Sequence, residues 1–159
     1  IAKILINDLS RTEEFAQYDN IEWADKETIY KAADIISLHL PLTHQTNNLI
    51  KKKELLMMND DAVLINTSRG GIVNELDLYN VMNLGHLSAA AVDVFDNEPY
   101  NGPLNEIKRC LLTAHMGSMS VDCRSRMELE ATEEAIRFLE NIPLQGEVTK
   151  QEYELQGNE

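Results

Sequence analysis

The sequence predicts an α/β fold in which a parallel β-sheet is covered by helices on both faces. Short apolar runs alternate with segments of helical character along most of the 159 residues, and this order is typical of parallel strands joined by crossover helices. The runs are continuously apolar and do not alternate with polar residues, which indicates strands that are buried on both sides. The length suits one domain with a substantial core.

Six apolar runs are expected to form the strands. They span residues 3–7, 21–23, 35–40, 62–66, 88–94 and 111–113. Pro41 ends the third run, because proline cannot donate a hydrogen bond to a sheet ladder. The run at 88–94 consists largely of small and β-branched residues, so a helix is expected to pack closely over it.

Four segments are expected to be helices. They span residues 26–33, 51–57, 75–84 and 120–141, and residues 11–17 are expected to form a turn or short helix. Asp25 and Asn74 can each cap the start of a helix by accepting a hydrogen bond from a free amide. Gly85 follows the third helix, where glycine commonly ends one, and the last helix is amphipathic. Residues 1–146 are expected to form the domain, and residues 147–159 a polar tail.

The composition argues against several kinds of partner. Fourteen Lys and Arg stand against 27 Asp and Glu, which gives a net charge of −13. Nucleic acids and anionic membranes favour basic surfaces, so neither is expected as a partner. No apolar run approaches the roughly 20 residues of a membrane-spanning helix.

The cysteines and histidines do not suggest a metal site. Cys110 and Cys123 lack the spacing of a metal or redox motif, and no histidine spacing resembles a zinc site. Because no signal peptide is visible, the cysteines are interpreted as reduced thiols in a cytoplasmic protein.

Three reactive side chains follow strands in the second half of the chain. Arg69 precedes two glycines after the strand at 62–66, Glu98 lies in a turn after the strand at 88–94, and His115 follows the last strand. Open α/β sheets bind ligands beyond the carboxyl ends of their strands, so these side chains can converge in one crevice. Arginine can hold a carboxylate through two hydrogen bonds, and histidine can transfer protons near neutral pH. The three residues predict acid–base chemistry on a small anionic substrate.

Each of these residues also has an ordinary structural interpretation. Arg69 can be a surface arginine in a loop, Glu98 one more surface acid, and His115 a structural histidine. Asp93 differs, because a charge inside an apolar strand needs a partner. Asp8, just past the first strand, can accept hydrogen bonds from an adenine ribose, or it can simply begin a turn.

The order and spacing of four segments resemble the D-isomer-specific 2-hydroxyacid dehydrogenases, which include D-lactate, glycerate and phosphoglycerate dehydrogenases. The segments are residues 33–43, where a strand ends in a proline-containing loop, and residues 66–71, 93–99 and 115–117. The resemblance covers about residues 3–142 and depends on the combination of segments. It implies a Rossmann-like NAD-binding domain, and hydride transfer between NAD and C2 of a small D-2-hydroxy or 2-keto acid.

The resemblance also implies a role for each candidate residue. Arg69 would bind the substrate carboxylate and polarise its 2-oxygen, His115 would be the general acid–base, and Glu98 would be its partner. Asp93 would hold the nicotinamide carboxamide, while Asp8 would favour NAD over NADP by repelling a 2′-phosphate. The remaining expected cofactor contacts are Leu40, Pro41 and Thr67.

Two features depart from the family pattern. The residue before the histidine is Ala114, where the family usually has proline, and this is expected to loosen the loop. The sequence also has no G-x-G-x-x-G turn, since its seven glycines fall at positions 70, 71, 85, 102, 117, 146 and 157. The family places a strand and that turn just before the segment that resembles residues 3–8. The Rossmann-like sheet is therefore expected to be incomplete, without its first strand, its glycine-rich turn and the substrate-binding lobe.

The missing strand would be central in a doubly wound sheet. A gap is therefore expected beside the strands at 3–7 and 35–40, closed by rearrangement, by another chain or by direct pairing of these two strands. The glycine-rich turn supplies amides for the pyrophosphate, so the isolated chain is expected to bind NAD weakly and to show no measurable turnover.

Two other functions remain open. Some relatives act as NAD-sensing transcriptional corepressors, so the chain could be a non-catalytic binding module, or it could be a degenerate gene product. The presence of all three side chains, Arg69, Glu98 and His115, favours an enzyme, because mutational drift in a gene without function would be expected to remove at least one of them. The resemblance also implies a homodimer.

Overall fold

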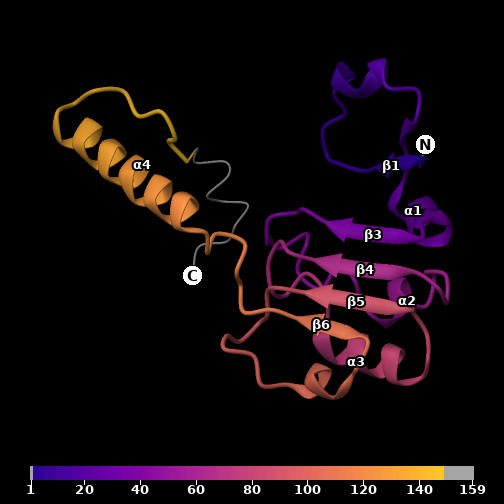
Figure 1. Ribbon diagram of the computed structural model, residues 1–159. Coiled ribbons are helices and arrows are strands. Elements are labelled where there is room, and N and C mark those ends of the chain that lie inside the picture. The colour runs from indigo at the N-terminus through magenta and orange to yellow at the C-terminus, as the bar shows by residue number, and fades with distance from the viewer. Residues whose placement is uncertain (1, 149–159) are drawn as a thin grey trace.

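The structure is a computed structural model that describes residues 2–148, and it contains all six expected strands (Figure 1). They are β1 (Ile4–Ile6), β2 (Ile21–Trp23), β3 (Ile35–Leu38), β4 (Val63–Asn66), β5 (Ala89–Val92) and β6 (Cys110–Leu112). The expected polar tail at 147–159 lies almost entirely outside the described residues.

The expected helices are also present, with bounds close to those predicted. They are α1 (Lys26–Ala32), α2 (Lys52–Leu55), α3 (Glu75–Asn83) and α4 (Val121–Leu139), with short 3₁₀ helices η1 (Glu13–Gln17) and η2 (Pro103–Glu106). Asp25 caps α1 by accepting a hydrogen bond from the amide of Thr28 at 2.7 Å. Asn74 caps α3 in the same way, and the amide of Asp77 donates to it at 3.0 Å. Local capping therefore sets the start of both helices.

All strand pairs are parallel, as predicted. β3, β4, β5 and β6 form a four-stranded sheet in that order, and β1 and β2 form a separate two-stranded sheet. Because the four strands run in one direction, their carboxyl ends lie along one edge of the sheet (Figure 1). The loops that carry Arg69, Glu98 and His115 begin at that edge.

The two sheets leave β1 and β3 unpaired with each other (Figure 1). Each has a hydrogen-bonded neighbour on one side only among residues 2–148, as expected from the sequence. Direct pairing of the strands at 3–7 and 35–40 is therefore wrong for the described chain. β1 pairs with β2, and β3 pairs with β4.

The hydrophobic core lies mainly on one face of the four-stranded sheet. Side chains alternate in burial along β3, where Ile36 and Leu38 are buried, while Ile35 is 63% exposed. The helices α1, α2 and α3 contact one another in sequence and contribute residues to the same core. Leu111 of β6 is 65% exposed. The parallel α/β class is confirmed, but the second face is less covered than the continuous apolar runs predict.

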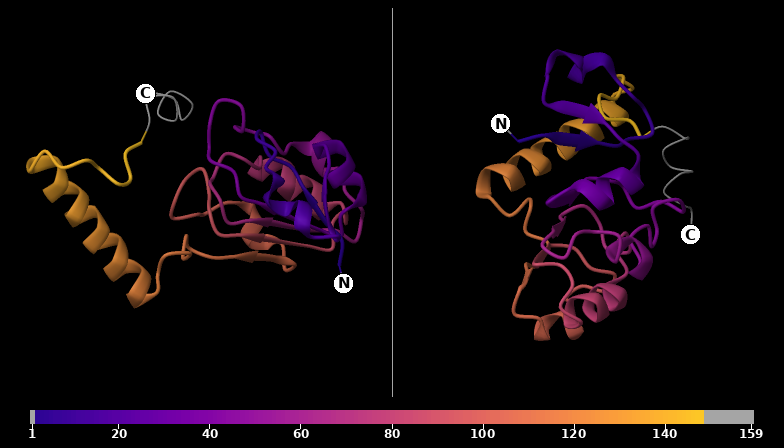
Figure 2. Two further views of the ribbon diagram at one scale, coloured as in Figure 1. Left: turned by 90° about the horizontal axis from the view of Figure 1, so that it is seen from above. Right: turned by 90° about the vertical axis from the view of Figure 1, so that its right-hand side faces the viewer.

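The helix α4 projects away from the four-stranded sheet in Figure 1 and in the left view of Figure 2. Its cap is Ser120, which accepts a hydrogen bond from the amide of Cys123 at 3.2 Å. No residue of α4 is buried, and Phe138 and Leu139 are 72% and 77% exposed. The apolar side of this amphipathic helix is therefore largely exposed, and Phe138 and Leu139 line a hollow with Ile142, Pro143 and Leu144. None of the helices in that range combines the length and the hydropathy that crossing a bilayer requires.

Candidate active site

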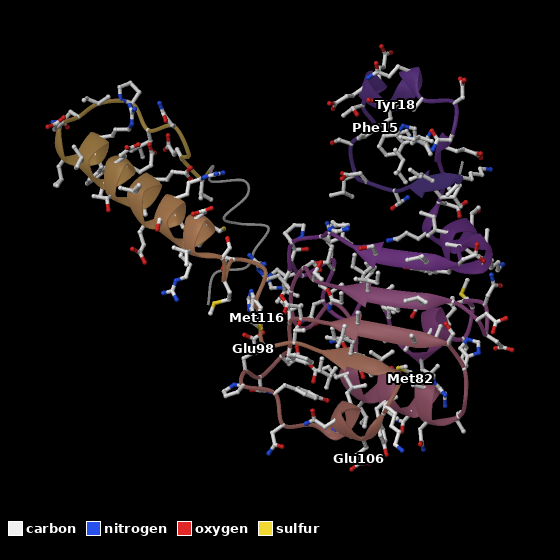
Figure 3. All side chains as sticks on the ribbon, viewed as in Figure 1. Phe15, Tyr18, Met82, Glu98, Glu106 and Met116 are labelled. Atoms are coloured by element: carbon white, nitrogen blue, oxygen red, sulfur yellow. The ribbon has the colours of Figure 1, made fainter. Side chains whose placement is uncertain are left out.

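The loops after all four strands of the larger sheet contribute residues to one cavity of about 350 Å³ at the carboxyl edge. Arg69 comes from the loop after β4, Glu98 from the loop after β5, and His115 from the loop after β6. The full lining consists of Leu42, Arg69, Gly70, Phe95, Asp96, Glu98 and His115. Figure 3 labels Glu98 and Met116 close together at this edge, far from Met82 at the opposite end of the strands. The structure thus brings together the three side chains that the sequence singled out for acid–base chemistry.

The buried side chain of Asn66 shapes the loop that carries Arg69. Its Oδ1 accepts hydrogen bonds from the amide and the hydroxyl of Ser68 at 3.2 and 2.8 Å. Its Nδ2 donates to the carbonyl oxygen of Arg69 at 3.1 Å. Ser68 and Arg69 are therefore both hydrogen-bonded to the buried side chain of Asn66, which fixes the loop.

The guanidinium of Arg69 has few protein partners that would compete with a bound anion. Its Nη1 donates to the carbonyl oxygen of Ser68 at 2.6 Å, and among residues 2–148 no carboxylate lies within ion-pair distance of it. Arginine has five N–H donors in a planar arrangement, so most of them stay free. A carboxylate in the cavity could accept two of these bonds at once.

Glu98 links the loop after β5 to the imidazole of His115. Its Oε1 accepts a hydrogen bond from the amide of Phe95 at 3.0 Å, and its Oε2 lies 3.0 Å from Nδ1 of His115. These bonds, the Phe95 amide first and His115 second, hold the pKa of the Glu98 carboxyl below its ordinary value. An ionised carboxylate only accepts hydrogen bonds, so Nδ1 must carry the proton that it donates to Glu98. Nε2 of His115 is then the ring atom that can exchange a proton with a ligand.

The His115 backbone has a conformation that is uncommon for a residue with a side chain. Its φ is +52°, in the left-handed region, which costs about 1–2 kcal/mol for an ordinary residue. Its amide donates to the carbonyl oxygen of Asp93 at 2.8 Å. The side chains of His115 and Glu98 keep 47% and 38% of their surface exposed, so a ligand in the cavity can reach both.

Asp93 is buried and its carboxylate has protein partners. The Thr113 hydroxyl donates to it, and the amide of Met116 donates to its two oxygens at 2.9 and 3.0 Å. Burial by itself raises the pKa of a carboxyl. At Asp93 the hydrogen bonds from Thr113 and from two backbone amides outweigh burial, so its pKa lies below the ordinary value. The charge that the sequence placed in an apolar strand is therefore stabilised within the protein.

The other candidate residues lie outside this cavity lining. Asp8 follows β1 in the smaller sheet, is exposed, and accepts a hydrogen bond from the amide of Ser10 at 3.1 Å. Leu40 and Pro41 follow β3; Leu40 packs against the core, and the carbonyl of Pro41 accepts a bond from the Thr46 hydroxyl at 2.6 Å. Thr67 follows β4 and is exposed. All but Asp8 lie at the same edge of the four-stranded sheet as the cavity.

Two cavity residues, Phe95 and Asp96, had no role expected from the sequence; they lie between Asp93 and Glu98. Leu42 lies in the loop after the strand predicted at 35–40, beside the expected cofactor contacts Leu40 and Pro41. The only sequence feature that could have indicated these residues is their position next to candidate residues at the ends of strands. Phe95 also stacks on Tyr100 with ring centroids 4.2 Å apart, a contact between loop residues that no sequence pattern indicates.

The arrangement combines an anion-binding group with a proton-transfer group. A small acid whose carboxylate sits on Arg69 would have its neighbouring carbon and oxygen near the imidazole that Glu98 orients. Groups of this kind suit general acid–base catalysis at a carbon next to a carboxylate.

Known proteins with this sequence pattern and fold include reductases of small acids. Glyoxylate reductase of Thermococcus litoralis is 38% identical over 137 residues, which cover 86% of this chain and 41% of that protein. The structure of D-lactate dehydrogenase with NAD+ from Lactobacillus jensenii matches with a TM-score of 0.82 and 26% identity, over 94% of this chain and 49% of that one. A glyoxylate reductase from Paecilomyes thermophila matches with a TM-score of 0.82 and 28% identity, over 94% of this chain and 45% of that one.

The chain therefore spans less than half the length of these relatives. The family match extends through β1 to β6 and includes Arg69, Glu98 and His115. Over residues 2–117 the sequence matches the NAD binding domain of the D-isomer specific 2-hydroxyacid dehydrogenases, and the chain belongs to that family.

Proposed function

We propose that this chain provides the cofactor-side half of a dehydrogenase site for small D-2-hydroxy acids and 2-keto acids. The observation that carries the proposal is the cavity on which Arg69, Glu98 and His115 converge, with Nδ1 of His115 bonded to Glu98. The glyoxylate and D-lactate named for the relatives are acids of the size that a cavity of about 350 Å³ admits.

In the proposed reaction, Arg69 binds the carboxylate of the acid and polarises the oxygen on C2. Nε2 of His115 takes the hydroxyl proton when the hydroxy acid is oxidised, and it returns that proton to the oxygen when the keto acid is reduced. Glu98 keeps the imidazole oriented and stabilises its protonated form. NAD, when bound, accepts or supplies the hydride at C2.

The residues present suit the nicotinamide end of that cofactor. The Asp93 carboxylate accepts hydrogen bonds from the Thr113 hydroxyl and the Met116 amide. An amide such as the nicotinamide carboxamide would be a further donor to this carboxylate. Leu40, Pro41 and Thr67 would line the cofactor beside it, and Asp8 would meet the ribose.

The pyrophosphate of NAD has no comparable binding motif, because the 159 residues contain no G-x-G-x-x-G turn. Amides at a helix N-terminus normally bind the pyrophosphate of a dinucleotide. We propose that the isolated chain binds NAD weakly and shows no measurable turnover. Isothermal titration of NAD into these 159 residues would contradict this proposal if it gave micromolar affinity.

The function is tested by a chimera, because the chemistry needs a complete site. Residues 3–142 replace the matching segment of the Thermococcus litoralis glyoxylate reductase, and NADH oxidation is followed with a panel of 2-keto acids. Turnover is expected, and His115→Ala is expected to lower kcat by about 10²–10⁴-fold, the usual contribution of proton transfer. A folded chimera that binds NADH and reduces none of the acids would overturn the proposal and favour a non-catalytic module.

We further propose a cytoplasmic homodimer. Cys110 and Cys123 are free thiols, which suits a reducing compartment, and the exposed apolar side chains of α4 favour association. Light scattering of the purified chain at several concentrations measures the oligomeric state directly.

A further inference from the structure

The segment that carries His115 is held by Asp93 at several atoms. The backbone carbonyl of Asp93 accepts from the amide of His115 at 2.8 Å. Its carboxylate accepts from the hydroxyl of Thr113 and, with both oxygens, from the amide of Met116 at 2.9 and 3.0 Å. One residue thus accepts hydrogen bonds from positions on both sides of His115 and from His115 itself.

The segment has other hydrogen bonds as well: the Thr113 amide donates to the carbonyl oxygen of Val92 at 3.0 Å, and Nδ1 of His115 lies 3.0 Å from Oε2 of Glu98. Thr113, Ala114, His115 and Met116 are all exposed, so burial does not hold them in place. The φ of +52° at His115 is unfavourable for a side chain with a β-carbon, and such a conformation persists only where surrounding interactions impose it. Ala114 does not restrict the backbone as a proline would.

Asp93, in contrast, is anchored. It is 9% exposed, directly follows β5, and its amide donates to the carbonyl oxygen of Asn66 at 3.0 Å. Asn66 is itself buried at the end of β4, where it shapes the Arg69 loop. Asp93 therefore attaches the exposed loop of His115 to the sheet through hydrogen bonds.

We propose that Asp93 is a positioning residue, which holds His115 in its left-handed conformation so that the imidazole stays against Glu98. This role is separate from any contact between Asp93 and a cofactor, and it rests on the proposed function only in that His115 is the proton carrier. The hydrogen bonds to the charged carboxylate, which are stronger than those to a neutral acceptor, would offset the unfavourable backbone conformation.

The test uses the 159-residue chain without substrate or cofactor. NMR measures the exchange of the His115 and Met116 amides with water, together with the Nδ1–H resonance of His115. Asp93→Ala removes the carboxylate and keeps the backbone carbonyl to which the His115 amide donates. In this variant the Met116 amide is expected to exchange about tenfold faster or more, and the Nδ1–H signal is expected to disappear through exchange with water. In Asp93→Asn, which keeps one side-chain oxygen, exchange is expected to accelerate about threefold and the signal to remain. Asp61→Ala is the control, an exposed aspartate in the turn before β4.

The amides of Leu64 and Ala90 in the central strands report whether each variant is folded. If Asp93→Ala is folded and its Met116 amide exchanges within twofold of the parent rate, the proposal is wrong. If that variant does not fold, an Asp93→Asn rate within twofold of the parent rejects the proposal equally. Neither readout needs turnover, so an inactive chimera would reject the proposed function and leave this result standing.

Discussion

The backbone of Gly70 lies so close to that of Phe95 that a β-carbon at position 70 would be 2.1 Å from the Phe95 carbonyl oxygen. The contact joins the loop of Arg69 to the loop of Glu98. The amide of Phe95 donates to Glu98 from the other side of the same residue. Two backbones in direct contact therefore set the spacing between the anion-binding group and the partner of the histidine.

We predict that Gly70→Ala destabilises the chain by about 1–3 kcal/mol, the usual range for overpacking. The obstacle is backbone, which cannot move aside as the end of a flexible side chain can. Urea denaturation measures the change in the free energy of unfolding. Gly146→Ala is the matched control, since nothing lies within 4 Å of the added β-carbon, and its effect is expected to stay within about 0.5 kcal/mol.

The lowered pKa of Asp93 predicts how stability depends on pH. Its hydrogen bonds favour the charged form in the folded state, so the folded pKa lies below the ordinary 3.8. The stability that Asp93 contributes is then fully present above pH 3.8 and is lost as the pH falls through the folded value. The difference in unfolding free energy between the parent chain and Asp93→Asn is expected to shrink between pH 6 and pH 3. A difference that stays constant over that range would mean that the carboxylate charge contributes nothing.

Sequence patterns predicted the strands and the helices because these depend on local signals. Asp25 and Asn74 cap the helices predicted for them, and β3 ends close to Pro41. Arg69, Glu98 and His115 meet because each follows a strand of one parallel sheet, and the topology places such positions together.

Other features depend on contacts between distant segments, which a single sequence does not specify. Nothing local to His115 predicts its positive φ, since Asp93, 22 positions earlier, imposes it through hydrogen bonds. No local signal indicated that the two faces of the sheet would be covered unequally. The sequence places Ile35 in an apolar run typical of the core, but Ile35 is 63% exposed. β1 pairs with β2 and β3 pairs with β4, so β1 and β3 are separate. The apolar residues of β1 and β3 would suit direct pairing of the two strands equally well, so the sequence does not distinguish the two arrangements.

Asn74 is predicted to matter beyond its role as a cap. Its Oδ1 accepts from the amide of Asp77, while its Nδ2 donates to Oδ1 of Asn48 at 2.8 Å. The amide of Asn48 in turn donates to the carbonyl of Gly71 at 2.6 Å. Asn74→Ala is expected to lower the free energy of unfolding by about 1–2 kcal/mol. Asn80→Ala, an exposed position of the same helix, is expected to be neutral or slightly stabilising, because alanine favours helix.

The two cysteines are predicted to differ in reactivity. Burial raises the pKa of the Cys110 thiol from 9.0 to about 11, and the thiolate is the reactive form. At pH 8 this lowers the thiolate fraction of Cys110 by about 100-fold relative to an ordinary thiol. Ellman's reagent is therefore expected to modify Cys110→Ser quickly through Cys123, and Cys123→Ser slowly. Equal rates for the two variants would show that the Cys110 thiol is not protected.

The final prediction concerns the charge of Glu98. Glu98→Gln keeps an oxygen that can accept from Nδ1 of His115 at the observed 3.0 Å, but it removes the negative charge that stabilises the protonated ring. In the chimera with the glyoxylate reductase, this change is expected to lower kcat/KM for keto-acid reduction by about tenfold or more, which corresponds to about 1.4 kcal/mol in the barrier. Glu106→Gln is the matched control, because Glu106 lies on η2, accepts a hydrogen bond from the hydroxyl of Tyr79 on α3, and is labelled apart from Glu98 in Figure 3. If both variants retain the parent kcat/KM, then Glu98 serves only to bind the Phe95 amide, and the proton-transfer role assigned to its contact with His115 is wrong.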